Sequence, residues 1–250
     1  MEDLQNIILR ISKARDQTKN LVQKTTSYKC DKCKDTTWIQ DENGVIISRC
    51  ECYTKDKLKK LWEKSGIKNL NASFKGFERW NAASDRLYCV ALDYYKKFND
   101  IRNERDNSAL FVGQPGSGKT YISLALANNF INNKSISVLY MPYRDCITSL
   151  KQNIVNKEDY ESSLKKYQEA EVLLIDDLYK GKITETDINI MFEIVNFRYL
   201  NNLPMIISSE HSIEKLLCID EAIASRIYQM SKSHVAQIEN DFSNNYRMKA

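Results

Sequence analysis

Residues 113–120 read GQPGSGKT, which matches the phosphate-binding pattern G-x-x-x-x-G-K-[ST] at every fixed position. The glycines let the backbone curl so that successive N–H groups point at phosphate oxygens, and a following helix adds the positive end of its dipole. In this pattern Lys119 reaches the β- and γ-phosphates, and the Thr120 hydroxyl binds Mg²⁺. The motif predicts an ATP site whose nucleotide-binding residues are Gly113, Gln114, Pro115, Gly116, Ser117, Gly118, Lys119 and Thr120.

The residues on either side of this loop have the pattern that the motif requires. The apolar run 109–112 is typical of a buried strand, and apolar residues between Ile122 and Ile131 give the next segment one apolar helix flank. A glycine-rich turn can match the motif by chance. The order strand, loop and helix favours the nucleotide-binding interpretation.

A second apolar run ends in two carboxylates. Residues 172–175 read VLLI and are followed by Asp176 and Asp177. Such a run is typical of a central parallel strand with acids at its carboxyl end, where α/β sheets bind ligands. We expect Asp176 to contact the nucleotide's Mg²⁺, directly or through water, and Asp177 to orient or deprotonate the attacking water. Taken alone, the run fits a buried strand before an acidic turn equally well. Its spacing from residues 113–120, with a strand and helices between, favours one site formed by the two motifs together.

The chain from residue 71 onward alternates between strand and helix patterns. Strands are predicted at 109–113, 136–141, 171–176 and 203–208, with helices between them and a helix at 86–105 ahead of the first. This alternation predicts an α/β fold with a parallel sheet covered by helices on both faces. We therefore expect residues 71–250 to form one nucleotide-binding domain.

Four of the seven cysteines form two close pairs near the N-terminus, Cys30 with Cys33 and Cys50 with Cys52. Two pairs separated by a hairpin-length insert are typical of a tetrahedral Zn²⁺ site, and four thiolates leave the metal no open position for catalysis. Four unrelated thiols are the alternative. With a helix expected within 1–27, we predict a zinc module over residues 1–53 and a basic linker over 54–70.

The composition is that of a globular chain. With 250 residues and 42% hydrophobic side chains, it is long enough for one sizeable core and a small accessory module. The formal charge of +4 permits contact with nucleic acid without arguing for it. No apolar run is long enough to span a bilayer, and the first residues lack a signal-peptide core. We expect a cytoplasmic protein with reduced cysteines and no membrane partner.

Four sequence blocks together carry a family resemblance: GQPGSGKT (113–120), VLLIDDL (172–178), PMIISSE (204–210) and EAIASRIYQM (221–230). In order and spacing they resemble the AAA+ helicase loaders of bacteria and phages, the DnaC/DnaI type, close to the IstB transposition ATPases. The resemblance covers about 70–250 and implies a P-loop NTPase of the AAA+ class. The cysteine module resembles the N-terminal zinc domain of Gram-positive loaders.

The resemblance implies roles for individual residues. Asp176 and Asp177 match the Walker B pair, and Arg226 matches an arginine finger that reaches the γ-phosphate of a neighbouring subunit in trans. An ordinary surface arginine is the alternative for Arg226. Glu210 stands at the sensor 1 position, where relatives usually have Asn. Either Glu210 has an altered role there, or the hydroxyl of Ser208 or Ser209 makes the γ-phosphate contact.

The resemblance also implies a function. We expect an ATPase that forms a homo-oligomer on ATP or DNA and delivers a hexameric replicative DNA helicase onto single-stranded DNA, with the zinc module binding the helicase. An IstB-type transposition helper, which binds duplex DNA and a transposase, is the alternative, although that type usually lacks the cysteine module. Within 141–156, Tyr143, Arg144 and Lys151 either contact single-stranded DNA or belong to an ordinary surface helix. A nucleotide-binding adapter without hydrolysis is disfavoured by the intact motifs.

Overall fold

The computed structural model describes residues 28–249. The helix expected within 1–27 lies outside the described residues. The described chain divides into two compact units, residues 28–56 and residues 57–249, with the boundary inside one helix. No helix among the described residues is both long and apolar enough to cross a membrane.

The first unit is a short β-hairpin followed by the start of a helix. Strands β1 (Trp38–Gln40) and β2 (Ile46–Arg49) pair antiparallel. Their turn is closed by the Asp41 carboxylate, which accepts hydrogen bonds from the backbone N–H groups of Asn43 (2.9 Å) and Val45 (2.8 Å). Helix α2 (Glu51–Ser65) follows at once, so most of the expected basic linker is helical.

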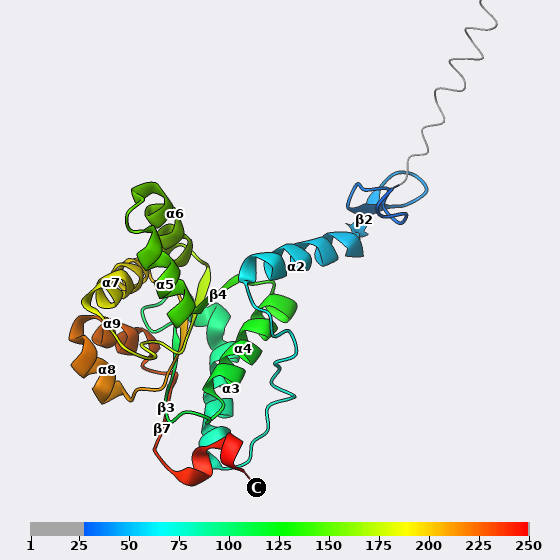
Figure 1. The fold of residues 1–250 in the computed structure, drawn as a ribbon. Helices are drawn as coiled ribbons and strands as arrows, with labels where there is room; N and C mark the ends of the chain where they lie inside the picture. The colour runs from blue at the N-terminus through cyan, green and yellow to red at the C-terminus, as the bar shows by residue number, and fades with distance from the viewer. Residues whose placement is uncertain (1–27, 250) are drawn as a thin grey trace, which may run out of the picture. The chain divides into compact units, whose positions relative to one another are not determined.

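The second unit contains a five-stranded parallel sheet with the strand order β4-β5-β6-β3-β7, which confirms the predicted fold class (Figure 1). Four of its strands fall at the predicted places, because each contains a short run of apolar residues that is largely buried in the sheet. The fifth strand, β7, was not anticipated from the sequence. The strands are β3 (Ala109–Gly113), β4 (Val138–Pro142), β5 (Val172–Asp176), β6 (Met205–Ser209) and β7 (Val235–Ile238).

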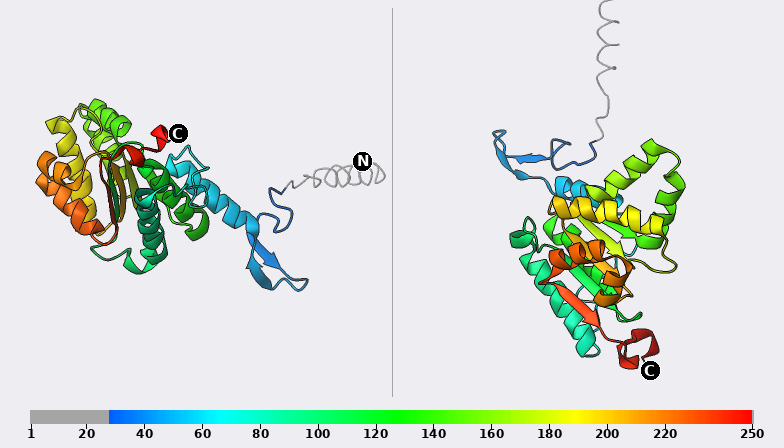
Figure 2. Two further views of the ribbon diagram at one scale, coloured as in Figure 1. Left: turned by 90° about the horizontal axis from the view of Figure 1, so that it is seen from below. Right: turned by 90° about the vertical axis from the view of Figure 1, so that its left-hand side faces the viewer.

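Helices cover both faces of this sheet (Figures 1 and 2). Alternate residues of each strand enter opposite cores: Phe111 packs with the helices of one face and Leu110 with those of the other. The first face is covered by α3 (Ala82–Ile101) and α4 (Lys119–Lys134). The second is covered by α5 (Tyr143–Asn153), α6 (Lys157–Gln168), α7 (Glu185–Leu200), α8 (Ile213–Ile219) and α9 (Glu221–Ser231). Two short 3₁₀ turns, η1 (Phe242–Asn244) and η2 (Tyr246–Met248), follow β7.

Candidate nucleotide-binding site and cysteine cluster

The GQPGSGKT loop connects the end of β3 to the first residue of α4. Gly113 has φ of 112°, and a Cβ there would overlap the backbone carbonyl of Ile238 on the adjacent β7. Only glycine therefore fits at this position unless the backbone of one strand shifts. The Lys119 ammonium donates hydrogen bonds to the carbonyls of Gly113 (2.8 Å) and Gln114 (2.6 Å). Burial lowers the pKa of Lys119 to about 8.

The two predicted magnesium ligands face each other across the site. The Thr120 hydroxyl donates to the Asp176 carboxylate at 2.9 Å, and this carboxylate also accepts hydrogen bonds from Ser208 (2.5 Å) and Tyr140 (3.1 Å). Burial, and next the nearby Asp176 charge, raise the pKa of Tyr140. A hydroxyl and a carboxylate that converge in this way form an oxygen donor set suited to Mg²⁺.

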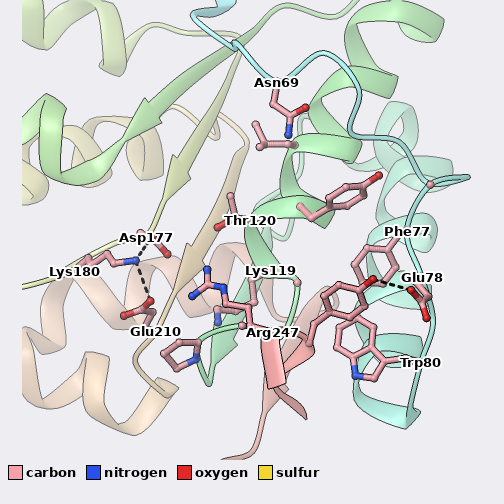
Figure 3. Close-up of a pocket in the computed structure, with 17 residues that line it drawn as sticks. Asn69, Phe77, Glu78, Trp80, Lys119, Thr120, Asp177, Lys180, Glu210 and Arg247 are labelled. Atoms are coloured by element: carbon pink, nitrogen blue, oxygen red, sulfur yellow. Dashed lines mark hydrogen bonds and ion pairs between the residues drawn. The ribbon is translucent and has the colours of Figure 1, made fainter. Parts of the chain in front are cut away.

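The next carboxylate along the chain, Asp177, is tied to a neighbouring lysine. Lys180 forms ion pairs with Asp177 at 2.7 Å and with Glu210 at 3.0 Å (Figure 3). The hydrogen bond to Asp177 is the main reason that the pKa of Lys180 is raised. The sequence contained no signal for this role of Lys180, because nothing in its local pattern shows which carboxylates it would meet.

The two serines at the end of β6 are used inside the fold. Both are fully buried, and the Ser208 hydroxyl lies against Asp176 and accepts the Asp177 backbone N–H at 2.9 Å. The Ser209 hydroxyl donates to the Leu178 carbonyl at 2.8 Å. Of Ser208, Ser209 and Glu210, which were the candidates for the sensor 1 contact, only Glu210 lines the cavity beside the phosphate-binding loop.

One end of a cavity of about 440 Å³ is lined by the lysines, the threonine and two of the carboxylates named so far: Lys119, Thr120, Asp177, Lys180 and Glu210. Its phosphate-binding end contains Lys119, Thr120 and Asp177, and its other end contains the aromatic side chains of Phe77 and Trp80 (Figure 3). An end with the glycine-rich loop and Lys119, and an end with aromatic rings, match the two halves of a nucleotide, its phosphates and its base. Sequence reasoning did not assign the aromatic end, although the non-periodic cluster of Phe and Trp residues at 74–80 was a usable signal.

The C-terminal segment lines one side of the cavity. The backbone N–H of Tyr246 donates to the Gly116 carbonyl at 2.9 Å, and its ring lies 4.9 Å from that of Trp80. The Tyr246 hydroxyl donates to Glu78 at 2.8 Å. Arg247, on the same segment, reaches into the cavity beside Lys119 (Figure 3).

Two other sets of predicted residues lie elsewhere. Arg226 on α9 does not line the cavity; it donates to the Ala222 carbonyl at 2.7 Å and lies over the Phe192 ring at 5.3 Å. Of the residues considered for DNA contact, Tyr143 is buried and Lys151 forms an ion pair with Asp187 at 2.7 Å. These two side chains are therefore occupied within the fold.

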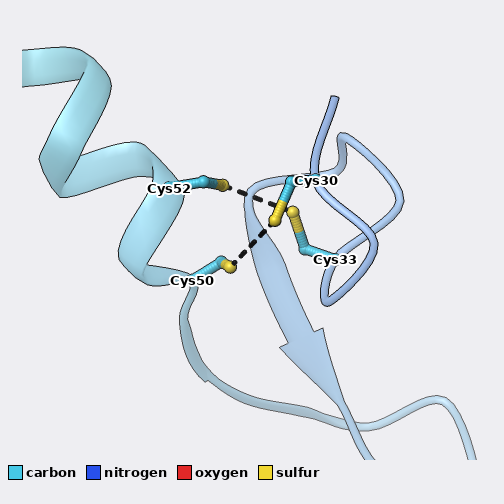
Figure 4. Close-up of side chains that lie close together, drawn as sticks. All are labelled: Cys30, Cys33, Cys50 and Cys52. Atoms are coloured by element: carbon cyan, nitrogen blue, oxygen red, sulfur yellow. Dashed lines mark hydrogen bonds between the residues drawn. The ribbon is translucent and has the colours of Figure 1, made fainter. Parts of the chain in front are cut away.

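The four cysteines predicted to bind zinc converge in the first unit. Cys30 and Cys33 precede β1, Cys50 follows β2, and Cys52 lies in the first turn of α2 (Figure 4). All four sulfurs lie within 4.8 Å of one another, with 3.7 Å between Cys30 and Cys50 and 3.4 Å between Cys33 and Cys52. Four sulfurs bound to one zinc at about 2.3 Å lie roughly 3.8 Å apart, so the cluster fits the metal.

Local hydrogen bonds favour ionisation at one of these thiols and oppose it at another. The Cys33 backbone N–H lowers the pKa of Cys30 to about 7, whereas the hydrogen bond with the Cys33 thiol raises the pKa of Cys52. Thiols that share protons in this way would lose them to a bound cation, because the thiolate is the metal ligand.

The parallel sheet, the loop leading into α4 and the carboxylates at the end of β5 define a P-loop ATPase of the AAA+ class. The model of the family described as IstB-like ATP binding protein matches residues 97–250, and the chain belongs to this family.

Comparisons with individual proteins agree with this class. The chain is 38% identical over 222 residues to the uncharacterized protein YqaM of Bacillus subtilis (strain 168), covering 85% of this chain and 68% of YqaM. It is 27% identical over 126 residues to the replicative helicase loader DnaC of Buchnera aphidicola subsp. Baizongia pistaciae, covering 52% of this chain and 49% of DnaC. A crystal structure of the DnaC helicase loader has the same fold, with a TM-score of 0.55 and 24% sequence identity. The match covers 69% of this chain and 99% of the DnaC chain.

Proposed function

We propose that this protein is an ATP-dependent helicase loader, which delivers a hexameric replicative helicase onto single-stranded DNA. The observation that carries the proposal is the combination of two units in one chain. One has an ATP-site geometry and a sequence relative named as a replicative helicase loader, and the other carries a four-cysteine cluster suited to a structural metal. A separate metal-stabilised unit is a natural adapter for a protein partner.

In this proposal the residues around the cavity bind ATP and prepare it for hydrolysis. The loop N–H groups and Lys119 bind the phosphates, while Thr120 and Asp176 hold Mg²⁺, which neutralises charge on the β- and γ-phosphates. Asp177 orients the attacking water. The convergence of Thr120 and Asp176 at 2.9 Å supports this assignment, because both must reach the same ion.

Assembly would complete the site. Arg226 lies away from its own subunit's cavity, which fits a residue that acts on the nucleotide of a neighbouring copy. An arginine supplied in trans stabilises transition-state charge and makes hydrolysis depend on the contact between subunits. Hydrolysis would then follow oligomerisation on single-stranded DNA or on the helicase, and would end the loading event.

The zinc unit is assigned the helicase-binding role. Zinc held by Cys30, Cys33, Cys50 and Cys52 would fix the hairpin of β1 and β2 against the start of α2. This hairpin presents exposed apolar side chains at Val45, Ile46 and Ile47, which are 54–65% exposed. Exposed apolar side chains that are adjacent on a rigid hairpin suit contact with a protein.

A transposition helper is the second candidate, and the match to the IstB-like family model is the observation that favours it. The two functions predict different partners. Affinity isolation of the full chain from its native host in the presence of ATP, with Cys33→Ser as the matched control, should recover a hexameric helicase that is lost from the control. Recovery of a transposase instead, together with preferential binding to duplex DNA, would reject the loader.

A further inference from the structure

Two carboxylates enter the phosphate-binding end of the cavity. Asp177 and Glu210 share the ammonium of Lys180, and their side chains are each 29% exposed. Glu210 directly follows the end of β6 and lines the cavity together with Lys119 and Thr120. A carboxylate is unexpected there, because the terminal charge of a bound triphosphate would lie nearby. An unpaired carboxylate there would repel the phosphate.

Lys180 is well placed to remove that repulsion. Among the described residues that line the cavity, the cations are Lys119, Lys180 and Arg247. Lys119 is already hydrogen-bonded to the loop carbonyls of Gly113 and Gln114. Lys180 is the cation that lies directly against Glu210.

The turn that carries Lys180 is fixed to the sheet. The backbone N–H of Leu178 donates to the Ser208 carbonyl at 2.8 Å, and the Ser209 hydroxyl donates back to the Leu178 carbonyl at 2.8 Å. The Lys180 N–H donates to the Asp177 carbonyl at 3.1 Å, which turns the chain back over the site. The fold therefore fixes the backbone of this turn, and the ion pairs with Asp177 and Glu210 orient the Lys180 ammonium.

We propose that Lys180, held by Glu210, contacts the γ-phosphate of ATP and, in doing so, releases Asp177 to orient the attacking water. An ammonium has three N–H donors, and the two carboxylates occupy two of them. When ATP is bound, the γ-phosphate replaces Asp177 as an anionic partner of the Lys180 ammonium, while Glu210 keeps its ion pair with Lys180. This inference rests on the ATP site proposed above.

The proposal predicts that ATP and ADP respond differently to loss of Lys180, because ADP lacks the γ-phosphate. In Lys180→Ala, ATP affinity should fall about 10- to 100-fold, the usual effect of losing a hydrogen bond to a charged group. ADP affinity should change by less than about threefold. Hydrolysis in a single turnover should also slow. Lys182→Ala removes an exposed lysine two residues away and is the matched control, expected to behave as wild type.

A double substitution makes the test specific. Lys180→Ala leaves Glu210 unpaired in the cavity, so adding Glu210→Asn should remove that repulsion and recover part of the preference for ATP over ADP, while the loss due to the missing γ-phosphate contact remains. Lys180→Arg should retain the preference. The proposal is overturned if Lys180→Ala binds ATP and ADP in the wild-type ratio, or if Glu210→Asn restores the full wild-type preference for ATP although Lys180 is absent. The ATP site itself is tested separately: unchanged binding of both nucleotides in Lys119→Ala would overturn the site and this inference together.

Discussion

Gly113 should be the least replaceable residue of the nucleotide loop, because two separate costs meet there. Its φ of 112° is unfavourable for an L-residue, which costs about 1–3 kcal/mol. In Gly113→Ala the new Cβ would also overlap the Ile238 carbonyl, and the Ile238 backbone C and N would be only 2.9 Å away. Backbone atoms cannot rotate aside, so β3 and β7 must separate, at a further cost of about 1–3 kcal/mol.

Gly181→Ala measures the cost of a positive φ alone, without the steric overlap. Gly181 has φ of 93° in the same unit, and a Cβ there would meet nothing within 4 Å. Melting temperature falls by roughly 2–4 °C per kcal/mol in domains of this size, so Gly113→Ala should melt about 2–12 °C below Gly181→Ala. Thermal unfolding followed by circular dichroism, with ATP titrations of both variants, measures the difference. Equal melting temperatures and unchanged ATP affinity in Gly113→Ala would refute the close approach of the two strands.

The remaining predictions concern the other proposed groups. Lys119→Ala should lose most ATP binding, whereas Asp177→Asn should bind ATP and stall hydrolysis; wild-type turnover in both would contradict the site. Because burial lowers the pKa of Lys119 to about 8, its charge is lost as pH rises through that value, and titration calorimetry should show ATP affinity falling above pH 8 and not below it. Arg226→Ala should keep nucleotide affinity but lose the rise in turnover per subunit with protein concentration, and mixing it with Asp177→Asn should restore part of the activity. Cys33→Ser should lower the zinc content found by elemental analysis and unfold the first unit while ATP binding persists; a wild-type protein without zinc would reject the metal site.

The strands, the loop and the order of elements were predictable because their signals are local. Residues 109–120 contain a strand, a turn and a helix start within one stretch, and the apolar run before Asp176 has the composition of a doubly buried strand. Strand β7 was missed because Val235–Ile238 is short and gains its place only by pairing with β3. Nothing in its own four residues separates it from a loop.

The aromatic wall formed by Trp80 and Tyr246 was missed for a related reason. Trp80 and Tyr246 are far apart in the chain and meet only in the folded protein, with 4.9 Å between their ring centroids. The environment of Glu210 was equally unpredictable, since its partner Lys180 lies 30 residues earlier. The cysteine cluster could be predicted because ligand spacing is itself a local signal.

The measurement that tests the central claim most directly is helicase loading on closed circular single-stranded DNA, which a preformed ring cannot enter by threading onto an end. Gel filtration of the DNA, with the hexameric helicase quantified in the DNA fraction, should show ATP-dependent co-elution when the wild-type chain is present. Lys119→Ala and Cys33→Ser should each abolish it, the first through ATP binding and the second through the helicase contact. Equal helicase loading with and without the chain, or with either variant, would contradict the account.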